Sequence, residues 1–322
     1  MFQCRISSSS PQPSASGGGL VPIRSRSQST FDLHARTTID TFLERAWTDH
    51  ADHAAAVADR LPQGLLLVHD DDGAIRLAAL AHHVLGEHLG RWQEGLAFLA
   101  QLAARGVHGT AGAASIARCQ ASLRLCGGVG DERAAMSASD QCRVTAMAAG
   151  SLAAFDTARA AALLQDAVAR AGPLPDADPA VRALAANGNG IAGTLQELTP
   201  LGAAQRDLMI RAAEVARASW QRAGTWLEVE RAEYRLALCW LAAGDPAQAL
   251  QHAQRCDAIV RENGSPPLEV FFAAEALCLP ARALGDGAGH AAAQACARQA
   301  FDALAADDQA WCRATLDKIN AS

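Results

Sequence analysis

Three groups of residues in this sequence could do chemistry: a glycine-rich stretch, a set of histidines and nine cysteines. The stretch GNGIAG at 188–193 matches the G-x-G-x-x-G pattern of dinucleotide-binding turns, which lie between a β-strand and a helix. The residues before it, DADPAVRALAA, open with Asp-Pro and continue with Ala, Leu and Arg, which is typical of a helix. We therefore predict helix glycines that allow very close packing or leave a groove wall bare, and we keep a nucleotide-binding enzyme as the weakest alternative.

Six histidines lie in the first third of the chain and could supply nitrogen ligands to a metal ion: His50, His53, His69, His82, His83 and His88. His50 and His53 are three residues apart and would share one face of a helix. His83 and His88 are five residues apart, a spacing that does not bring two side chains together on an α-helix. We therefore predict surface or interface histidines and no metal site.

The nine cysteines include no C-x-x-C pair, and most of them lie in stretches rich in Ala and Leu that resemble helices. This pattern predicts buried, reduced thiols rather than a disulfide framework or a zinc site. The start MFQCRISSSS lacks the apolar segment of a secretory signal, so we expect a cytoplasmic protein.

The single lysine, Lys318, argues against several reaction classes because it lies close to the end of the sequence. Walker A loops, Schiff-base enzymes and pyridoxal-phosphate enzymes all need a placed lysine. The H-E-x-x-H and G-x-S-x-G signatures are also missing from the sequence. We therefore expect a protein that is not an enzyme and that uses no cofactor.

The composition favours helices and argues against nucleic acid and membrane as partners. Half of the 322 residues are hydrophobic but only 5% are aromatic, and alanine is abundant, which suits close-packed helices better than β-sheets. The net charge of −6 leaves no broad phosphate-binding face, and no apolar run reaches the length of a membrane span.

The sequence divides into a low-complexity tail, residues 1–36, and a helical domain, residues 37–322. The tail is rich in Ser, Pro and Gly and is predicted to be disordered. Beyond it, apolar residues recur every three or four positions between short Gly, Pro or Asp breaks. This pattern predicts helices at 38–60, 73–89, 91–105, 111–126, 131–149, 152–171, 179–196, 203–222, 225–243, 246–263, 268–284, 290–305 and 308–320. The run GLLLVHD at 64–70 is the best strand candidate, but we predict one turn of helix there.

The segment AEYRLALCWLAAGDPAQALQHAQRC at 232–256 resembles a tetratricopeptide repeat, which is a pair of antiparallel helices. With Gly244-Asp245 as the turn, Leu236, Ala237 and Trp240 fall on the large, small and aromatic positions of the first helix. The turn Gly285-Asp286 ends a similar pattern, although Pro280 departs from the family and predicts a late start or a bend. The resemblance is clearest over 230–305 and implies an all-α superhelix, a solenoid of helical hairpins.

In tetratricopeptide proteins the first helices of the pairs line a concave groove that binds peptides. The resemblance implies that the groove of this chain contains Asn189, Gln196, Arg231, Tyr234, Arg235, Leu238, Glu275 and Arg282. Arg231 and Arg235 fall where co-chaperones of the family hold a peptide carboxylate, and Tyr234 would pack against the stem of the partner. Gly190 replaces the asparagine that the family places in the preceding repeat. The alternative is that both arginines pair with nearby carboxylates on a solvated face: Glu228, Glu230 or Glu233.

The function we expect is that of a non-catalytic adaptor or regulatory module. It would bind a protein or peptide segment in the groove, and the two arginines favour an acidic one. The first alternative is a ligand-sensing repeat module that acts in trans on a signalling partner. The second is the nucleotide-binding enzyme that would use GNGIAG.

Overall fold

The computed structural model describes the backbone of residues 29–321 and the side chains of residues 39–321. Within this range the chain forms α-helices, one π-helix and one 3-10 turn, and no β-strand occurs among the described residues. The all-α prediction is therefore confirmed. Most of the predicted tail lies outside the described residues, but helix α2 begins at Ser29, ahead of the predicted boundary at 36.

The chain divides after Ala135 into two compact units, a division that the sequence pattern did not indicate. The first unit contains α2 (Ser29–Leu67), α3 (Asp71–Ala81), the π-helix η1 (His82–His88), α4 (Trp92–Ala104), α5 (Thr110–Gly127) and the 3-10 turn η2 (Arg133–Ala135). Within it, η1 packs against α2, α3 and α4, and α5 packs against α3 and α4. Helix α2 continues through Pro62 to Leu67, so the predicted turn of helix after this proline is present.

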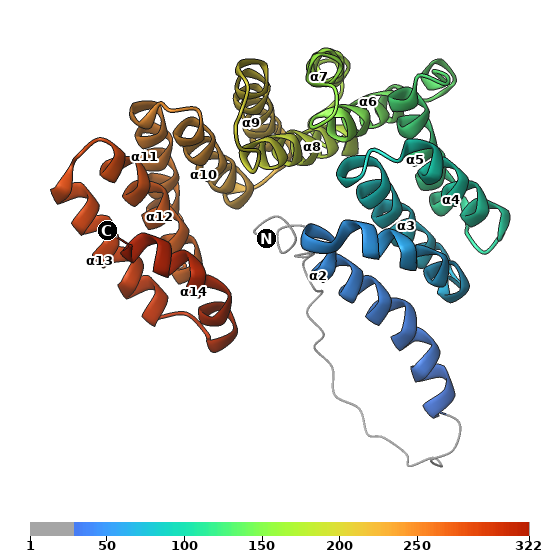
Figure 1. Cartoon of the computed structure of the whole chain (residues 1–322), viewed down its shortest axis with the longest axis horizontal. Coiled ribbons are helices and arrows are strands. Elements are labelled where there is room, and N and C mark those ends of the chain that lie inside the picture. Colours follow the sequence, from blue (N-terminus) through green and yellow to red (C-terminus); the bar gives the residue numbers. More distant parts are fainter. Residues whose placement is uncertain (1–28, 322) are drawn as a thin grey trace. The chain divides into compact units, whose positions relative to one another are not determined.

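The second unit, which begins at Met136, is a stack of helical hairpins. Its helices are α6 (Ala138–Leu152), α7 (Thr157–Ala171), α8 (Pro179–Gln196), α9 (Ala203–Ala223), α10 (Trp226–Ala242), α11 (Pro246–Glu262), α12 (Pro267–Ala283), α13 (Gly287–Asp302) and α14 (Ala306–Asn320). The hairpins are α6–α7, α8–α9, α10–α11 and α12–α13 (Figure 1).

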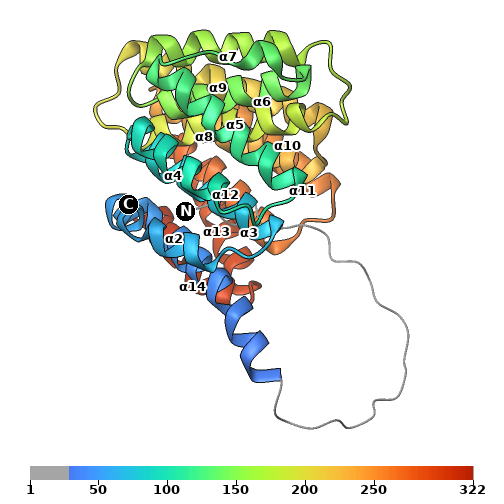
Figure 2. The same cartoon turned by 90° about the vertical axis from the view of Figure 1, so that its right-hand side faces the viewer.

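The hairpins are arranged in two layers. Their first helices contact one another in order, from α6 through α8 and α10 to α12 and α14. In the other layer α7 lies beside α9 (Figure 2). This stacking of consecutive hairpins is the solenoid that the sequence predicts. We call α8, α10 and α12 the A-row, because they are the first helices of the last three hairpins.

Local polar and glycine residues set the ends of these helices. Asp178 and Asp245 precede a proline, and each side chain accepts a hydrogen bond from a backbone N–H in the first turn. Gly244 and Gly285 follow α10 and α12 with φ of 87° and 73°, a conformation that glycine adopts without steric cost. Ser137 caps α6 in the same way as the aspartates, so this helix begins at Ala138 rather than at the predicted 131.

Helix α12 contains the proline that departs from the repeat pattern. The helix begins at Pro267 and continues through Pro280 to Ala283, so the late start considered from the sequence is wrong. Proline removes one backbone hydrogen bond from a helix. Pro280 is nevertheless accommodated as one of the buried residues of the helix.

The glycines of GNGIAG lie inside α8, as predicted, and they have two different environments. A Cβ atom on Gly188 would lie 2.8 Å from the carbonyl oxygen of Ala212 and 3.2 Å from the backbone nitrogen of Ala216, both on α9. A Cβ atom on Gly190 would meet nothing within 4 Å. Gly188 therefore allows the close approach of two helix backbones, whereas Gly190 leaves an open surface.

We expect alanine substitutions at these two glycines to change stability in opposite directions. Gly190→Ala should raise the free energy of unfolding by about 0.5 to 1 kcal/mol, because alanine is the better helix former and its methyl group has room. Gly188→Ala should lower it by about 1 to 3 kcal/mol, because the methyl group would clash with the backbone of α9. Urea unfolding followed by circular dichroism measures both changes, and a shift of the same sign in the two variants would contradict this packing.

The described cysteines match the prediction of buried thiols. None of the eight forms a disulfide, and all except Cys296 are buried. Burial raises the pKa of the Cys142 thiol to about 11 and that of the Cys239 thiol to about 12. Cys4 lies outside the described residues. Among the described helices, none is both long and apolar enough to cross a membrane.

Candidate functional site

Polar contacts link the three helices of the A-row and involve most of the predicted groove residues. Nη1 of Arg235 on α10 donates a hydrogen bond to Oε1 of Gln196 on α8, at 2.6 Å. On the other side of α10, the hydroxyl group of Tyr234 donates to Oε2 of Glu275 on α12, at 2.7 Å. The structure therefore brings these predicted residues together across neighbouring hairpins.

Tyr234 and Glu275 are core residues rather than surface residues. Their exposed fractions are only 5% and 8%. The ring of Tyr234 also packs edge-on against Phe272, with ring centroids 5.7 Å apart. Burial raises the pKa of Glu275, against the hydrogen bond from Tyr234 and the positive charge of Arg235. Contrary to the expectation from the sequence, Tyr234 is not available to pack against a partner, because α12 already encloses it.

Arg231 is held by a carboxylate of the protein itself. Its Nη2 lies 2.6 Å from Oε1 of Glu269 and its Nε lies 3.3 Å from Oε2. A bidentate ion pair therefore joins α10 to α12. Only 16% of the Arg231 side chain and 6% of the Glu269 side chain are exposed. Arginine and carboxylate match well in this geometry. Arg231 therefore neutralises the charge of the buried Glu269 carboxylate.

The three glutamates that the sequence suggested as partners of these arginines bind other groups. Glu228 accepts hydrogen bonds from Thr225 and Arg182. Glu233, with 1% of its side chain exposed, lies 2.9 Å from Nε of Arg217 and 2.7 Å from Nδ1 of His252. Glu228 and Glu233 are therefore held by arginines other than Arg231 and Arg235, and the buried pair of Arg231 is with Glu269, a carboxylate that the sequence did not suggest.

Glu230 is the most unusual carboxyl group of α10. Its exposed fraction is 1%, and the thiol of Cys256 on α11 donates to its Oε1 at 2.9 Å. Burial raises the pKa of Glu230 to about 8, and the negative charge of Glu269 acts in the same direction.

The remaining predicted groove residues lie at or near the surface of the second unit. Asn189 and Leu238 are half-buried, and Arg282 is exposed with its Nη1 donating to the backbone oxygen of Ala321 at 2.8 Å. Arg235 is half-buried as well. Its Nε is a buried donor without a hydrogen-bond partner, and no carboxylate of the described residues forms an ion pair with it.

A cluster of histidine side chains lies in the first unit, where the sequence predicted no metal site. His83 and His88 belong to η1, whose backbone has the wider turn of a π-helix: the N–H of Leu89 bonds to the oxygen of Val84, five residues earlier. In this geometry residues five apart lie above one another. Nε2 of His83 is consequently 3.1 Å from Nε2 of His88. The prediction that these two histidines face apart is wrong, because it assumed an α-helix.

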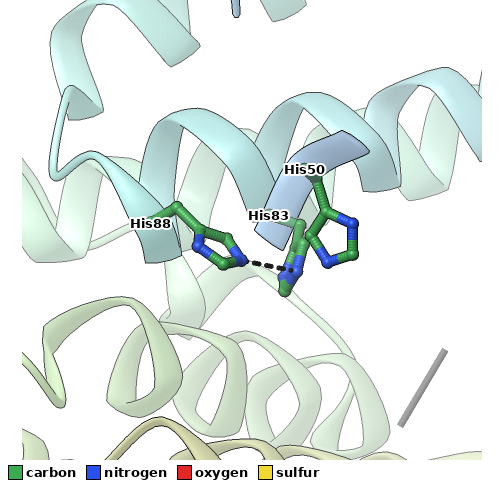
Figure 3. A group of neighbouring side chains, drawn as sticks. All are labelled: His50, His83 and His88. Carbon is green, nitrogen blue, oxygen red and sulfur yellow. Dashed lines mark hydrogen bonds between the residues drawn. The ribbon is translucent and has the colours of Figure 1, made fainter. Parts of the chain in front are cut away.

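His50 on α2 completes this cluster, as Figure 3 shows. Its ring centroid lies 5.0 Å from that of His83 and 5.2 Å from that of His88. One nitrogen of each of the three rings lies within 4.8 Å of the others. The predicted pairing of His50 with His53 does not form this cluster, because His53 lies at a kink in α2 with φ of −136° and ψ of 40°. We call His50, His83 and His88 the histidine triad.

Glu87 sets the electrostatics of the triad. Burial favours the protonated form of its carboxyl group, but the charge of His83 and hydrogen bonds from His82 and His83 outweigh burial and hold the pKa of Glu87 well below its ordinary value. For His83, burial lowers the pKa and the charge of Glu87 raises it, with a net increase. Burial and the neighbouring histidines lower the pKa of His88 to about 4 and also lower the pKa of His50.

The comparisons of this chain with models of protein families, with curated proteins and with solved structures found no match. The fold by itself therefore defines the class: an all-α protein whose second unit is a solenoid of helical hairpins.

Proposed function

We propose that this chain is a non-catalytic binding module of the tetratricopeptide type that holds an acidic segment of a partner protein along the A-row. The single observation that carries the proposal is the environment of Arg235. Its guanidinium group is fixed by Gln196 but has no carboxylate of the described residues to neutralise it, and its Nε lacks a hydrogen-bond partner. A carboxylate of a bound segment would supply the missing negative charge.

The position of Arg235 favours a strong contact with such a carboxylate. The side chain is half-buried, so water screens its charge less than at an exposed site. Its hydrogen bond to Gln196 also limits its freedom, which lowers the entropy lost on binding. Arg231 has a different role in this proposal, because its charge is already matched by Glu269.

Two further expectations belong to the same proposal. The buried, reduced cysteines are those of a protein that works in the cytoplasm. The position of residues 188–193 within α8, rather than in the strand–turn–helix unit of a dinucleotide fingerprint, supports the binding proposal over the nucleotide-binding alternative.

The experiment is a binding measurement by fluorescence anisotropy with a library of Asp- and Glu-rich peptides, each paired with its Asn and Gln counterpart. Acidic peptides should bind and their neutral counterparts should bind at least ten-fold more weakly. Affinity should decrease with salt, because partly exposed charges are screened over about 8 to 10 Å. Arg235→Ala should weaken binding about 10- to 100-fold, the loss expected for a charge-assisted hydrogen bond.

Arg298→Ala provides the matched control, because Arg298 is exposed on α13 and bonds to Asn320. It should leave peptide affinity unchanged. The proposal is rejected if no acidic peptide is preferred over its neutral counterpart, or if Arg235→Ala and Arg298→Ala bind alike. It is also rejected if Arg235→Ala acts only by lowering the melting temperature.

A further inference from the structure

We propose that the histidine triad binds a divalent transition-metal ion of the zinc class. The proposal concerns the first unit and is independent of the peptide-binding function proposed for the A-row. His50 comes from α2, whereas His83 and His88 come from consecutive turns of η1 (Figure 3). Imidazole nitrogens are ligands that zinc, nickel, copper and iron share.

The distances between the rings suit one shared ion. Zinc–nitrogen bonds measure about 2.0 to 2.1 Å, so two ligands of a tetrahedral ion lie about 3.3 Å apart. The Nε2 atoms of His83 and His88 are 3.1 Å apart, and the nitrogen of His50 lies within 4.8 Å of both. A small movement of the His50 ring therefore completes a three-nitrogen site.

The hydrogen bonds on the far side of two rings direct the lone pairs toward this site. Nδ1 of His50 donates to the backbone oxygen of Trp47 at 2.6 Å, which assigns the proton of the neutral ring to Nδ1 and the lone pair to Nε2. Nδ1 of His83 donates to Oε2 of Glu87 at 2.5 Å, with the same consequence. A carboxylate or carbonyl behind the ligating ring is the usual outer shell of a metal-bound histidine.

Glu87 is itself held by buried side chains. Its Oε1 lies 3.5 Å from Nδ1 of His82, and Nε2 of His82 lies 3.0 Å from the hydroxyl group of Ser122 on α5. Both His82 and Ser122 are buried. A line of contacts thus runs from the core of the first unit to the ligand His83. Such support fixes the orientation of His83 before an ion arrives, which lowers the entropy lost on binding.

The backbone of η1 supplies the second argument. A π-helix is rare, and it occurs frequently at functional sites. Here it places His83 and His88 on one face, which a regular α-helix would not do. The exposure of His88 leaves the fourth coordination position accessible to water or to an external ligand.

The donor set also selects the ion. Magnesium and calcium prefer oxygen ligands, so three imidazole nitrogens disfavour them. The test is isothermal titration of the chelator-treated full-length chain with ZnCl₂, with MgCl₂ as the comparison. We expect one zinc ion per chain, no binding of magnesium, and a melting temperature that rises with zinc concentration. Co²⁺ should give the intense visible absorption of a tetrahedral site.

Single substitutions separate this site from binding by other histidines. His88→Ala removes an exposed ligand without disturbing the core and should weaken zinc binding about 100-fold or more. Glu87→Gln removes only the negative charge behind the ligand His83, so its expected effect is smaller, about 10- to 100-fold. His53→Ala is the matched control, because His53 is exposed on the same helix as His50. The proposal is overturned if zinc does not bind, or if His88→Ala and His53→Ala retain equal affinity and the same Co²⁺ spectrum.

Discussion

Replacement of Arg231 by alanine is expected to lower the free energy of unfolding by about 3 to 5 kcal/mol, the range measured when one partner of a buried ion pair is removed. The reason is Glu269, which has only 6% of its side chain exposed and would lose the charge that neutralises it. The negative charge of Glu269 also disfavours the ionised form of its neighbour Glu230. Urea unfolding at neutral pH, followed by circular dichroism, measures the change.

Two further variants test the cause of that loss. Arg261→Ala removes an ion pair of similar composition, but 73% of the Arg261 side chain is exposed, so the change should stay within about 0 to 1 kcal/mol. Glu269→Gln, added to Arg231→Ala, should restore part of the stability because it removes the unpaired charge. If Arg231→Ala costs no more than Arg261→Ala, the pair with Glu269 is not a buried pair in solution, and Arg231 regains the groove role that its position in the repeat implies.

The stability of the protein is also expected to decrease from pH 6 to pH 8 by about 2 kcal/mol, because of Glu230 alone. The pKa of Glu230 is raised to about 8 in the folded chain, whereas the unfolded chain has the ordinary value near 4.5. A carboxyl group with a raised pKa contributes its stability fully below the unfolded pKa. That contribution decreases as pH rises above this value and is lost at the folded pKa, where the buried group must ionise.

Burial is the largest cause of the raised pKa of Glu230, and three facing groups modify it. They are the thiol of Cys256 on α11, the carboxylate of Glu269 on α12 and the guanidinium group of Arg231 on α10 itself. Glu230→Gln should abolish the decrease that Glu230 causes, and the variant should be the more stable protein above pH 8. Glu228→Gln is the control, because the pKa of Glu228 is lowered and the group does not titrate in this window. An equal pH dependence in the wild-type chain and in Glu230→Gln would show that Glu230 is ionised throughout.

Much of the fold follows from local sequence. Asp-Pro pairs begin α8 and α11, and glycines with positive φ end α10 and α12. The Ala-rich pattern of three and four residues fills the segments between them, and it predicted the hairpins of the second unit. These features depend on residues only a few positions apart, and sequence patterns report such short-range interactions well.

The repeat pattern also indicated which helices of the second unit are neighbours, but it did not reveal the bonding between their side chains. The repeat register brought Gln196 and Arg235 to adjacent helices, where they form a hydrogen bond. The repeat pattern could not show that Tyr234 would form a buried hydrogen bond with Glu275. It also could not show that Arg231 would pair with Glu269, thirty-eight positions later in the chain. A pattern of one helix does not specify which side chain of the next hairpin will meet it.

The histidine triad is a clearer example of contacts that local sequence patterns do not reveal. Six histidines are present in the first third of the sequence. The five-residue spacing of His83 and His88 indicates two neighbouring side chains only if the backbone there is a π-helix. The sequence by itself determined an all-α chain and many of its turns. Only the tertiary structure decided which side chains meet, because packing of η1 against α2 brings His50 beside His83 and His88, and stacking of hairpins sets the neighbours of α10. Both are long-range interactions whose free energy depends on the whole fold rather than on local propensity.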